Sequence, residues 1–440
     1  MQFRKIGKTD IEASAIAMGC WVIGGWMWGG ADESEAIRAI QTSLDEGITM
    51  IDTAPIYGLG RSETIVGKAI KGRKRDDIVI ASKCAIVWST EIWEKGKGEL
   101  HSYIDDHGFT QDFRQYAMYR YMNPKSMKEE IDKSLKRLGT DYIDVMQIHH
   151  CMDRTTPIAD AMGALEELRT AGKIRAIGIS NATPEQFEEF CKAGSLDVDQ
   201  ERYSLIDRTV EKNGLLAGCD KNEVSFFAYS PLESGLLTGR VDPDRSYADG
   251  DHRKGNPNFA SDFVRKINKK LEEFTDIGRK YDLNTAQLMI AWILARYRKL
   301  HALCGARNAE QAANNAKAGH VVLDPDDVKA IDEKVVFGIS PGGFIDNLLL
   351  DDRYYTDIKT WMSKPGYIDY ICPQIYWSFS HKTYPFGKTV DRWSSLLKTN
   401  SVDLYIGIPA YKAGSNEEPE FKSNPNILVD MVEYGQKNGK

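Results

Sequence analysis

Two hydrophobic patterns alternate along the first three quarters of the chain. Short, continuous apolar runs predict buried β-strands at residues 15–18, 49–52, 78–82, 143–148, 176–180, 198–203, 225–229 and 302–304. Between them, apolar residues at helical spacing predict amphipathic helices at residues 34–46, 62–71, 126–138, 158–171, 184–192 and 285–296. This alternation is typical of βαβ units on a parallel sheet. About eight such units in roughly 300 residues favour a closed (β/α)8 TIM barrel over an open sheet.

Two segments of this region depart from the alternation. Residues 3–12 place Gly7 and Asp10 in a turn between two short alternating runs, which predicts an N-terminal β-hairpin on the barrel floor. Residues 85–123 form a long loop after the third strand, where a βα loop usually has two to six residues. Aromatic side chains gather here and after the first strand, namely Trp21, Trp26, Trp28, Trp88, Trp93, Tyr116, Tyr119 and Tyr121. They either pack the insertion onto the barrel or line a broad pocket that stacks on apolar faces of a substrate.

A second pattern begins near residue 338. Apolar runs at 367–377 and 402–414 predict buried strands, with helices at 356–362, 389–398 and 426–438. The chain therefore divides into a barrel domain of residues 1–337 and a partial β/α segment of residues 338–440. So few parallel strands leave sheet edges and an apolar face uncovered. The cover would come from the barrel helices, from a second copy of the chain in a homo-oligomer, or from a continuation of the chain.

Composition and charge narrow the functional classes. The chain has 57 Lys and Arg against 64 Asp and Glu, a net charge of −7, and no long basic run, which argues against nucleic acid as a partner. The N-terminus lacks the apolar run of a signal peptide, and no segment is long and apolar enough to cross a bilayer. The seven cysteines are scattered, with no metal-binding spacing. We expect a cytoplasmic protein without a bound metal and without a membrane partner.

Ionisable residues stand where the predicted strands end. Asp52, Lys83 and His149 each close an apolar run, and Tyr57 follows Asp52 by five residues. In a (β/α)8 barrel the functional side chains project from the carboxyl ends of the strands, so we expect these four to meet. Taken singly, a buried Asp–Lys pair and a core histidine would be structural features. Their joint occurrence at the expected strand ends favours a catalytic site.

Four motifs in a fixed order carry a family resemblance: IDTAPIYGLGRSE at 51–63, LGTDYID at 138–144, GKIRAIGISN at 172–181 and GARNAEQ at 305–311. With them, residues 1–337 resemble the aldo/keto reductase family. The resemblance implies NAD(P)H-dependent interconversion of a carbonyl and an alcohol. Residues 338–440 resemble a fragment of a glycoside-hydrolase-like barrel family. Asp369 and Asp403 stand at strand beginnings and form no carboxylate pair of the kind glycoside hydrolysis uses, which argues against hydrolase activity.

The resemblance also assigns roles to the strand-end residues. Tyr57 would donate the proton, and Lys83 beside it would lower the high pKa of the phenol. Asp52 would keep Lys83 charged and oriented, and His149 would hydrogen-bond the carbonyl oxygen. His150, the next residue along the strand, is expected to face the other way and to be structural.

The cofactor positions follow the same resemblance. Ser180, Asn181 and Gln200 would bind the nicotinamide carboxamide and Tyr203 would stack on its ring. The pyrophosphate loop would contain Ser230, Leu232, Gly235 and Leu237, and the adenosine site Gly305, Arg307, Gln311 and Asn315. A guanidinium at Arg307 suits a 2′-phosphate and so favours NADP. Gly305 and Asn314 stand where many relatives have Lys and Glu, which keeps NAD open.

Two alternatives remain at this stage. Some proteins of this fold are cofactor-binding regulatory subunits. The aromatic rim and the C-terminal segment also fit a sugar- or glycoside-processing oxidoreductase, so the substrate is expected to be a small carbonyl compound or a sugar.

Overall fold

The computed structural model describes residues 1–89, 98–103, 117–334, 338–348, 357–364, 368, 370–399 and 402–437. The chain forms two compact units, Met1–Ile331 and Asp332–Lys440. The expected domain boundary at 337/338 stays a prediction, because residues 335–337 lie outside the described residues.

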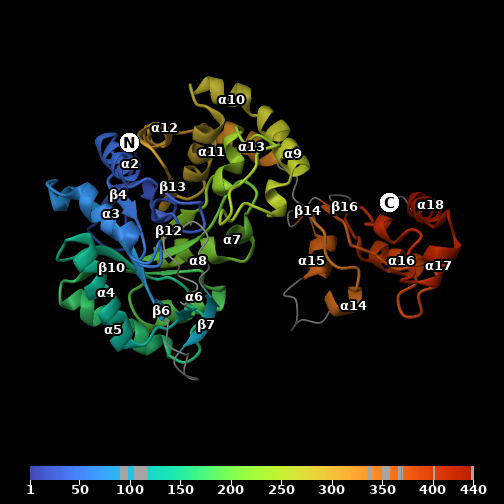
Figure 1. The fold of residues 1–440 in the computed structure, drawn as a ribbon, viewed down its shortest axis with the longest axis horizontal. Coiled ribbons are helices and arrows are strands. Elements are labelled where there is room, and N and C mark those ends of the chain that lie inside the picture. Colours follow the sequence, from blue (N-terminus) through green and yellow to red (C-terminus); the bar gives the residue numbers. More distant parts are fainter. Residues whose placement is uncertain are drawn as a thin grey trace. The chain divides into compact units, whose positions relative to one another are not determined.

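The first unit is a closed barrel of eight parallel strands (Figure 1). The strands, in the order of the chain, are β3 (Ile16–Gly19), β4 (Met50–Asp52), β5 (Val79–Cys84), β9 (Ile143–Ile148), β10 (Ile174–Ser180), β11 (Val198–Arg202), β12 (Ser225–Tyr229) and β13 (Leu300–Gly305). All eight coincide with apolar runs of the sequence, because a strand enclosed by helices outside and side chains inside is buried on both faces. The predicted (β/α)8 TIM barrel is confirmed.

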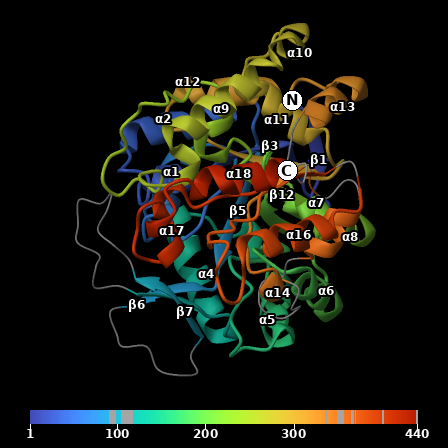
Figure 2. The same cartoon turned by 90° about the vertical axis from the view of Figure 1, so that its right-hand side faces the viewer.

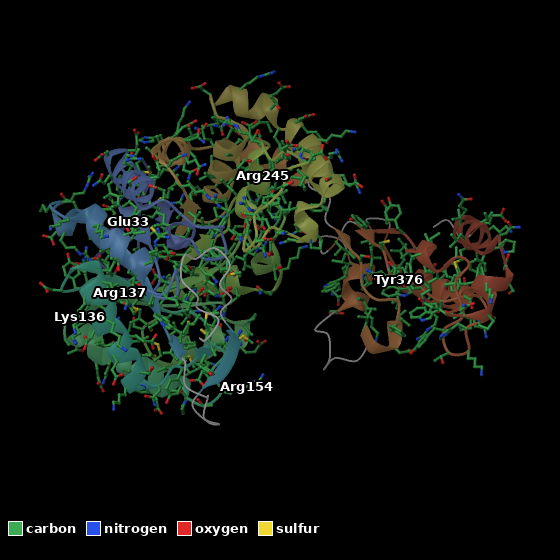
Figure 3. All side chains as sticks on the ribbon, in the orientation of Figure 1. Glu33, Lys136, Arg137, Arg154, Arg245 and Tyr376 are labelled. Carbon is green, nitrogen blue, oxygen red and sulfur yellow. The ribbon has the colours of Figure 1, made fainter. Side chains whose placement is uncertain are left out.

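Helices surround the barrel in alternation with the strands: α2 (Glu33–Asp45), α3 (Arg61–Ile70), α4 (Pro124–Leu138), α5 (Ile158–Thr170), α6 (Pro184–Ala193), α8 (Leu215–Asn222), α11 (Thr285–Leu294), α12 (Ala309–Ala318) and α13 (Pro325–Lys334). Capping residues fix several of their starts. Thr183 and Asn284 each form a capping box with a Gln three residues later. Figure 3 shows Lys136 on the outer face of α4, as an amphipathic helix requires.

The predicted N-terminal hairpin closes one end of the barrel. β1 (Phe3–Lys5) pairs antiparallel with β2 (Glu12–Ser14). Ile6 and Ile11, in the turn region, are 0% and 2% exposed and pack against inward-facing strand residues such as Ala17 and Phe227. The hairpin seals the amino end of the barrel interior, so a ligand site has to open at the carboxyl end.

The insertion after the third barrel strand lies where the sequence predicted it. Its described part is an antiparallel sheet of β6 (Ile86–Ser89), β8 (Ala117–Arg120) and β7 (Glu99–Tyr103), in that order, and so is more regular than the expected loop. Trp93 and Tyr116 lie outside the described residues. Ile86 and Met118 of this sheet face the cavity described below.

The second unit contains three short parallel strands, β14 (Gly338–Ile339), β15 (Tyr370–Ile371) and β16 (Asp403–Leu404). Its helices are α14 (Ile345–Leu348), α15 (Ile358–Ser363), α16 (Phe386–Leu396), α17 (Pro419–Ser423) and α18 (Ile427–Lys437), of which α16 and α18 pack together (Figure 2). The strands are shorter than the apolar runs predicted, since beyond Ile371 and Leu404 the pairing continues as single bridges at Gln374 and Gly407. Asp403 begins β16 as expected, and Asp369 lies outside the described residues.

Candidate active site

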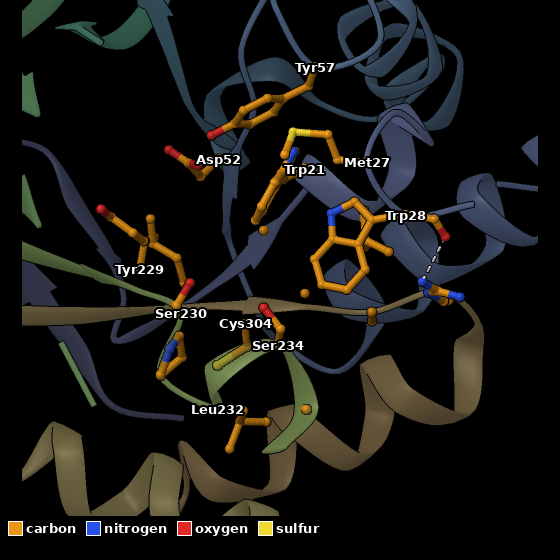
Figure 4. A pocket seen from close by; sticks show the side chains of 18 of the residues that line it. Trp21, Met27, Trp28, Asp52, Tyr57, Tyr229, Ser230, Leu232, Ser234 and Cys304 are labelled. Atoms are coloured by element: carbon orange, nitrogen blue, oxygen red, sulfur yellow. Dashed lines mark hydrogen bonds between the residues drawn. The ribbon is translucent and has the colours of Figure 1, made fainter. Parts of the chain in front are cut away.

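A cavity of about 940 Å³ lies at the carboxyl ends of the barrel strands (Figure 4). Its polar lining comes from the last residues of the strands and the loops that follow them: Asp52, Tyr57, His149, His150, Ser180, Asn181, Gln200, Tyr229 and Ser230. The barrel thus brings residues from distant parts of the sequence to one place. The volume of the cavity is in the range of small-molecule and cofactor sites.

A buried ion pair forms the floor of the cavity. Lys83, on β5, is 1% exposed, and its Nζ lies 2.7 Å and 2.9 Å from the two carboxylate oxygens of Asp52 on β4. Nζ also donates to the Thr53 carbonyl at 3.0 Å, and Gln200 Nε2 donates to Asp52 Oδ2 at 2.9 Å. Both charges are costly to bury, and these additional hydrogen bonds offset part of that cost.

Tyr57 lies directly against this pair. Lys83 Nζ is 5.0 Å from the centre of the Tyr57 ring, and the hydroxyl end of the ring points toward Asp52 (Figure 4). Burial, together with the negative charge of Asp52, raises the pKa of Tyr57 well above its ordinary value. Burial and Asp52 outweigh any lowering by Lys83, whose charge is paired with Asp52 at 2.7 Å, and the expected stabilisation of a phenolate by Lys83 stays a prediction. The hydroxyl is protonated at neutral pH, which is the state that a proton donor needs.

Two histidines follow β9 and both line the cavity. The rings of His149 and His150 are stacked, with centroids 5.4 Å apart and planes at 21°. The His149 ring lies edge-to-face with Tyr57 at 5.7 Å. The expectation that His150 faces away is wrong, because β9 ends at Ile148 and the alternation of a strand stops there.

Ser180, Asn181 and Gln200 line the cavity as the sequence predicted. Ser180 Oγ donates to the Gln200 carbonyl at 2.8 Å, so the ends of β10 and β11 are held together. Tyr229, the last residue of β12, donates from its hydroxyl to Asn181 Oδ1 at 2.8 Å. These groups place amide and hydroxyl functions at one end of the cavity.

The structure corrects the assignment of Tyr203. This side chain is fully buried outside the cavity, with its hydroxyl bonded to Glu211 and its ring against Phe226 and Trp292. On β11 Gln200 points inward, and Tyr203, three residues further and beyond the strand end, points to the helix side. Tyr229 lines the cavity instead. The sequence contained a signal for Tyr229, because this residue ends a predicted strand immediately before Ser230.

The loop after β12 bends back over the cavity. Ser230, Leu232, Ser234 and Gly235 line it, whereas Leu237 is fully buried and is not among the lining residues, which corrects that assignment. Ser230, Ser234 and Gly235 have φ angles of 56°, 55° and 100°, in the left-handed region. Backbone N–H groups in such a loop can converge on an anion.

Gly305, Arg307, Gln311 and Asn315 line the far end of the cavity, as predicted. Arg307 donates to the Trp28 carbonyl at 3.2 Å, a bond drawn dashed in Figure 4. Arg245 and Arg253 line the same end, and burial with these two positive charges lowers the pKa of Arg307. Arg253 is paired with Asp251 at 2.6 Å. Sequence reasoning missed Arg245 and Arg253, because they lie in a segment without periodicity. Their guanidinium groups make this end of the cavity suited to an anionic group.

In the described part of the chain, no cluster of three His, Cys, Asp or Glu side chains is arranged to hold a metal ion. Within the same ranges, none of the helices has the length and apolar character needed to cross a membrane.

A closed barrel of parallel strands with a polar cavity at their carboxyl ends is the arrangement of a (β/α)8-barrel enzyme. The model of the aldo/keto reductase family matches residues 15–336, and the chain belongs to this family. Residues 314–423 match a second model, glycosyl hydrolase-like 10. The protein is therefore an enzyme that interconverts a carbonyl and an alcohol by hydride transfer with a nicotinamide cofactor.

Relatives cover most of the barrel. The chain is 37% identical over 332 residues to the NADH-specific methylglyoxal reductase of Escherichia coli, covering 74% of this chain and 96% of the relative. It is 36% identical over 333 residues to the aldo-keto reductase YhdN of Bacillus subtilis, covering 75% and 92%. The solved glycerol dehydrogenase from Gluconobacter oxydans has 33% identity and a TM-score of 0.65, covering 76% of this chain and 94% of its own.

Proposed function

We propose that Asp52, Tyr57, Lys83 and His149 form the catalytic set of an NADPH-dependent reductase of small aldehydes and ketones. The observation that carries the proposal is the Tyr57 ring, whose centre lies 5.0 Å from the buried Lys83 Nζ and 5.7 Å from the His149 ring, in a cavity of about 940 Å³. A purely structural ion pair would not need a protonated phenol above it.

These residues divide the work of carbonyl reduction. A bound nicotinamide cofactor would supply the hydride. As negative charge develops on the carbonyl oxygen, the Tyr57 hydroxyl gives up its proton to that oxygen. Lys83 stabilises the phenolate that remains, and Asp52 holds Lys83 in position. His149 hydrogen-bonds the carbonyl oxygen and fixes its orientation.

The chain's own residues fit the cofactor along the cavity. Ser180, Asn181 and Gln200 would bind the carboxamide, with Tyr229 taking the place first assigned to Tyr203. Ser230, Leu232 and Gly235 would contact the pyrophosphate, and Gly305, Arg307, Gln311 and Asn315 the adenosine. The cluster of Arg245, Arg253 and Arg307 supports a 2′-phosphate and hence NADP. The Escherichia coli relative is named NADH-specific, which keeps NAD as the alternative.

The relatives indicate which substrates to try first. Methylglyoxal and glycerol, in the names of two of them, are small oxygenated molecules. Oxidation of NADPH and of NADH with methylglyoxal, followed by absorbance, tests the proposal. A kcat/KM that is higher with NADPH than with NADH supports the proposal. Cofactor binding without turnover of any aldehyde, ketone or sugar would instead favour a regulatory role.

The cellular setting is a proposal of the same kind. All seven cysteines are free thiols, which supports a reducing compartment such as the cytoplasm.

A further inference from the structure

We propose that His150 is a specificity-determining residue: it hydrogen-bonds an oxygen on the carbon next to the reacting carbonyl. The site would then select substrates with two oxygens on adjacent carbons, as in dicarbonyls and hydroxy-carbonyls. The inference rests on the proposed function, in which His149 holds the reacting oxygen.

The placement of the two imidazoles is the first ground. Their rings are stacked 5.4 Å apart, nearly parallel, and both line the cavity. The His149 ring also lies edge-to-face with Tyr57, at 5.7 Å. One wall therefore presents two separate imidazoles, one at the proton donor and one beside it. Oxygens on adjacent carbons are the smallest pair of groups that can use both.

The backbone around His150 is fixed on both sides. Asn181 Nδ2 donates to the His149 carbonyl at 2.9 Å, and the His149 N–H donates to the Cys84 carbonyl at 3.0 Å. Gln186 Nε2 donates to the Cys151 carbonyl at 2.6 Å, and Cys151 is 2% exposed. His150 thus projects from a segment anchored before and after it. A side chain that is already held in place before binding loses less conformational entropy when the substrate binds.

Another wall of the cavity is apolar. Trp26, Ile56, Ile86 and Met118 form one hydrophobic cluster, against which Met27, Tyr57 and Trp88 pack. Ile86 and Met118 come from the small sheet of the insertion. Such a wall accommodates an alkyl or aryl substituent but does little to orient a second oxygen. Of these two walls beside Tyr57, the imidazole wall presents ring nitrogens that can donate a hydrogen bond to that oxygen, and we place its recognition there.

The test compares diacetyl with methyl ethyl ketone, which differ in the second oxygen. The wild-type enzyme should have the higher kcat/KM for diacetyl. His150→Leu should lower the ratio of the two kcat/KM values by about tenfold, the effect of one lost hydrogen bond of about 1.4 kcal/mol. His150→Gln, which keeps a donor and an acceptor, should recover part of the ratio. Cofactor affinity, measured by fluorescence, should stay unchanged in both variants.

Two results would contradict this inference. Equal losses for both ketones would show that His150 acts through the fold alone, and an unchanged ratio would show that it does not meet the substrate. Wild-type enzyme that reduces neither ketone nor methylglyoxal with either cofactor would overturn the proposed function itself, a different result from an unchanged ratio in an active enzyme.

Discussion

Lys83 and Asp52 depend on each other at the floor of the cavity. Their side chains are 0% and 4% exposed, so removal of one leaves a buried charge without its partner. Lys83→Met should therefore lower the free energy of unfolding by about 3–5 kcal/mol, measured by urea denaturation. The double variant with Asp52→Asn should lose clearly less than Lys83→Met alone. Additive losses from the two substitutions would show that the pair is not coupled.

Substitution of Arg307 tests whether the enzyme binds NADPH through its 2′-phosphate. If its guanidinium binds a 2′-phosphate, Arg307→Ala should weaken NADPH binding by about 1.5–3 kcal/mol and leave NADH nearly unaffected, as titration calorimetry can measure. Arg265→Ala is a matched control, because Arg265 is exposed and pairs with Asp244 and Asp262 away from the cavity lining. Equal weakening of both cofactors would remove the 2′-phosphate assignment.

Strand alternation predicts the direction of side chains inside a strand, and it does not predict the direction of side chains beyond the strand end. Asp52 and Lys83 belong to strands, so the period of two fixes which way they point. His150 and Tyr203 follow strands, and there the same period gave the wrong side for His150. The net pKa of Tyr57 could not be predicted from Lys83 alone, since burial and the charge of Asp52 both raise it.

Strand β11 presents different chemistry on its two faces. Gln200 points into the barrel, whereas Asp199 and Glu201, with 0% and 8% exposure, point toward the helices. Burial raises the pKa of both carboxyl groups, and each is close enough to influence the other. Glu201 Oε1 also accepts a hydrogen bond from the Ala182 N–H at 2.7 Å.

Because the two carboxyl groups on β11 are buried, we expect the free energy of unfolding to depend on pH. Below about pH 4 both carboxyls are protonated in the folded and the unfolded chain. Above that, the unfolded chain releases protons that the folded pair retains, so the pair's contribution to the free energy of unfolding falls as pH rises. In Glu201→Gln, melting temperatures from pH 5 to pH 9 should fall less steeply than in the wild type. Parallel curves of melting temperature against pH for the wild type and Glu201→Gln would show that Glu201 is ionised in the folded protein.

Elements differ in how far the sequence predicts them. Barrel strands are buried on both faces, so their apolar runs are unmistakable. The insertion has short runs with little alternation, and its sheet depends on pairing between residues some thirty positions apart, such as Ile86 with Arg120. The strands of the second unit are shorter than predicted, because some of its apolar residues lie in loops that pack on the core.

At the scale of the whole molecule, each unit has its own hydrophobic core. The second unit buries Ile371, Phe386, Trp393 and Phe421 among its own residues. All proposed catalytic and cofactor residues lie in the first unit. A chain truncated after Lys334 should therefore remain folded and keep its NADPH-dependent kcat within about twofold of the full chain.

Light scattering on both forms tests self-association through the second unit. If this unit forms a homo-oligomer, the full chain should be larger than a monomer and the truncated chain should be monomeric. Loss of turnover in a folded truncation would show instead that residues after 334 complete the active site, and would favour a sugar- or glycoside-processing role for both parts.

The central claim is that the Tyr57 hydroxyl donates the proton in carbonyl reduction, and the kcat of Tyr57→Phe tests it most directly. The substitution removes one oxygen and keeps the ring against Lys83 and His149. We expect kcat with NADPH and methylglyoxal to fall by on the order of 100-fold or more, with cofactor affinity nearly unchanged. A variant that retains near-normal kcat would contradict the account.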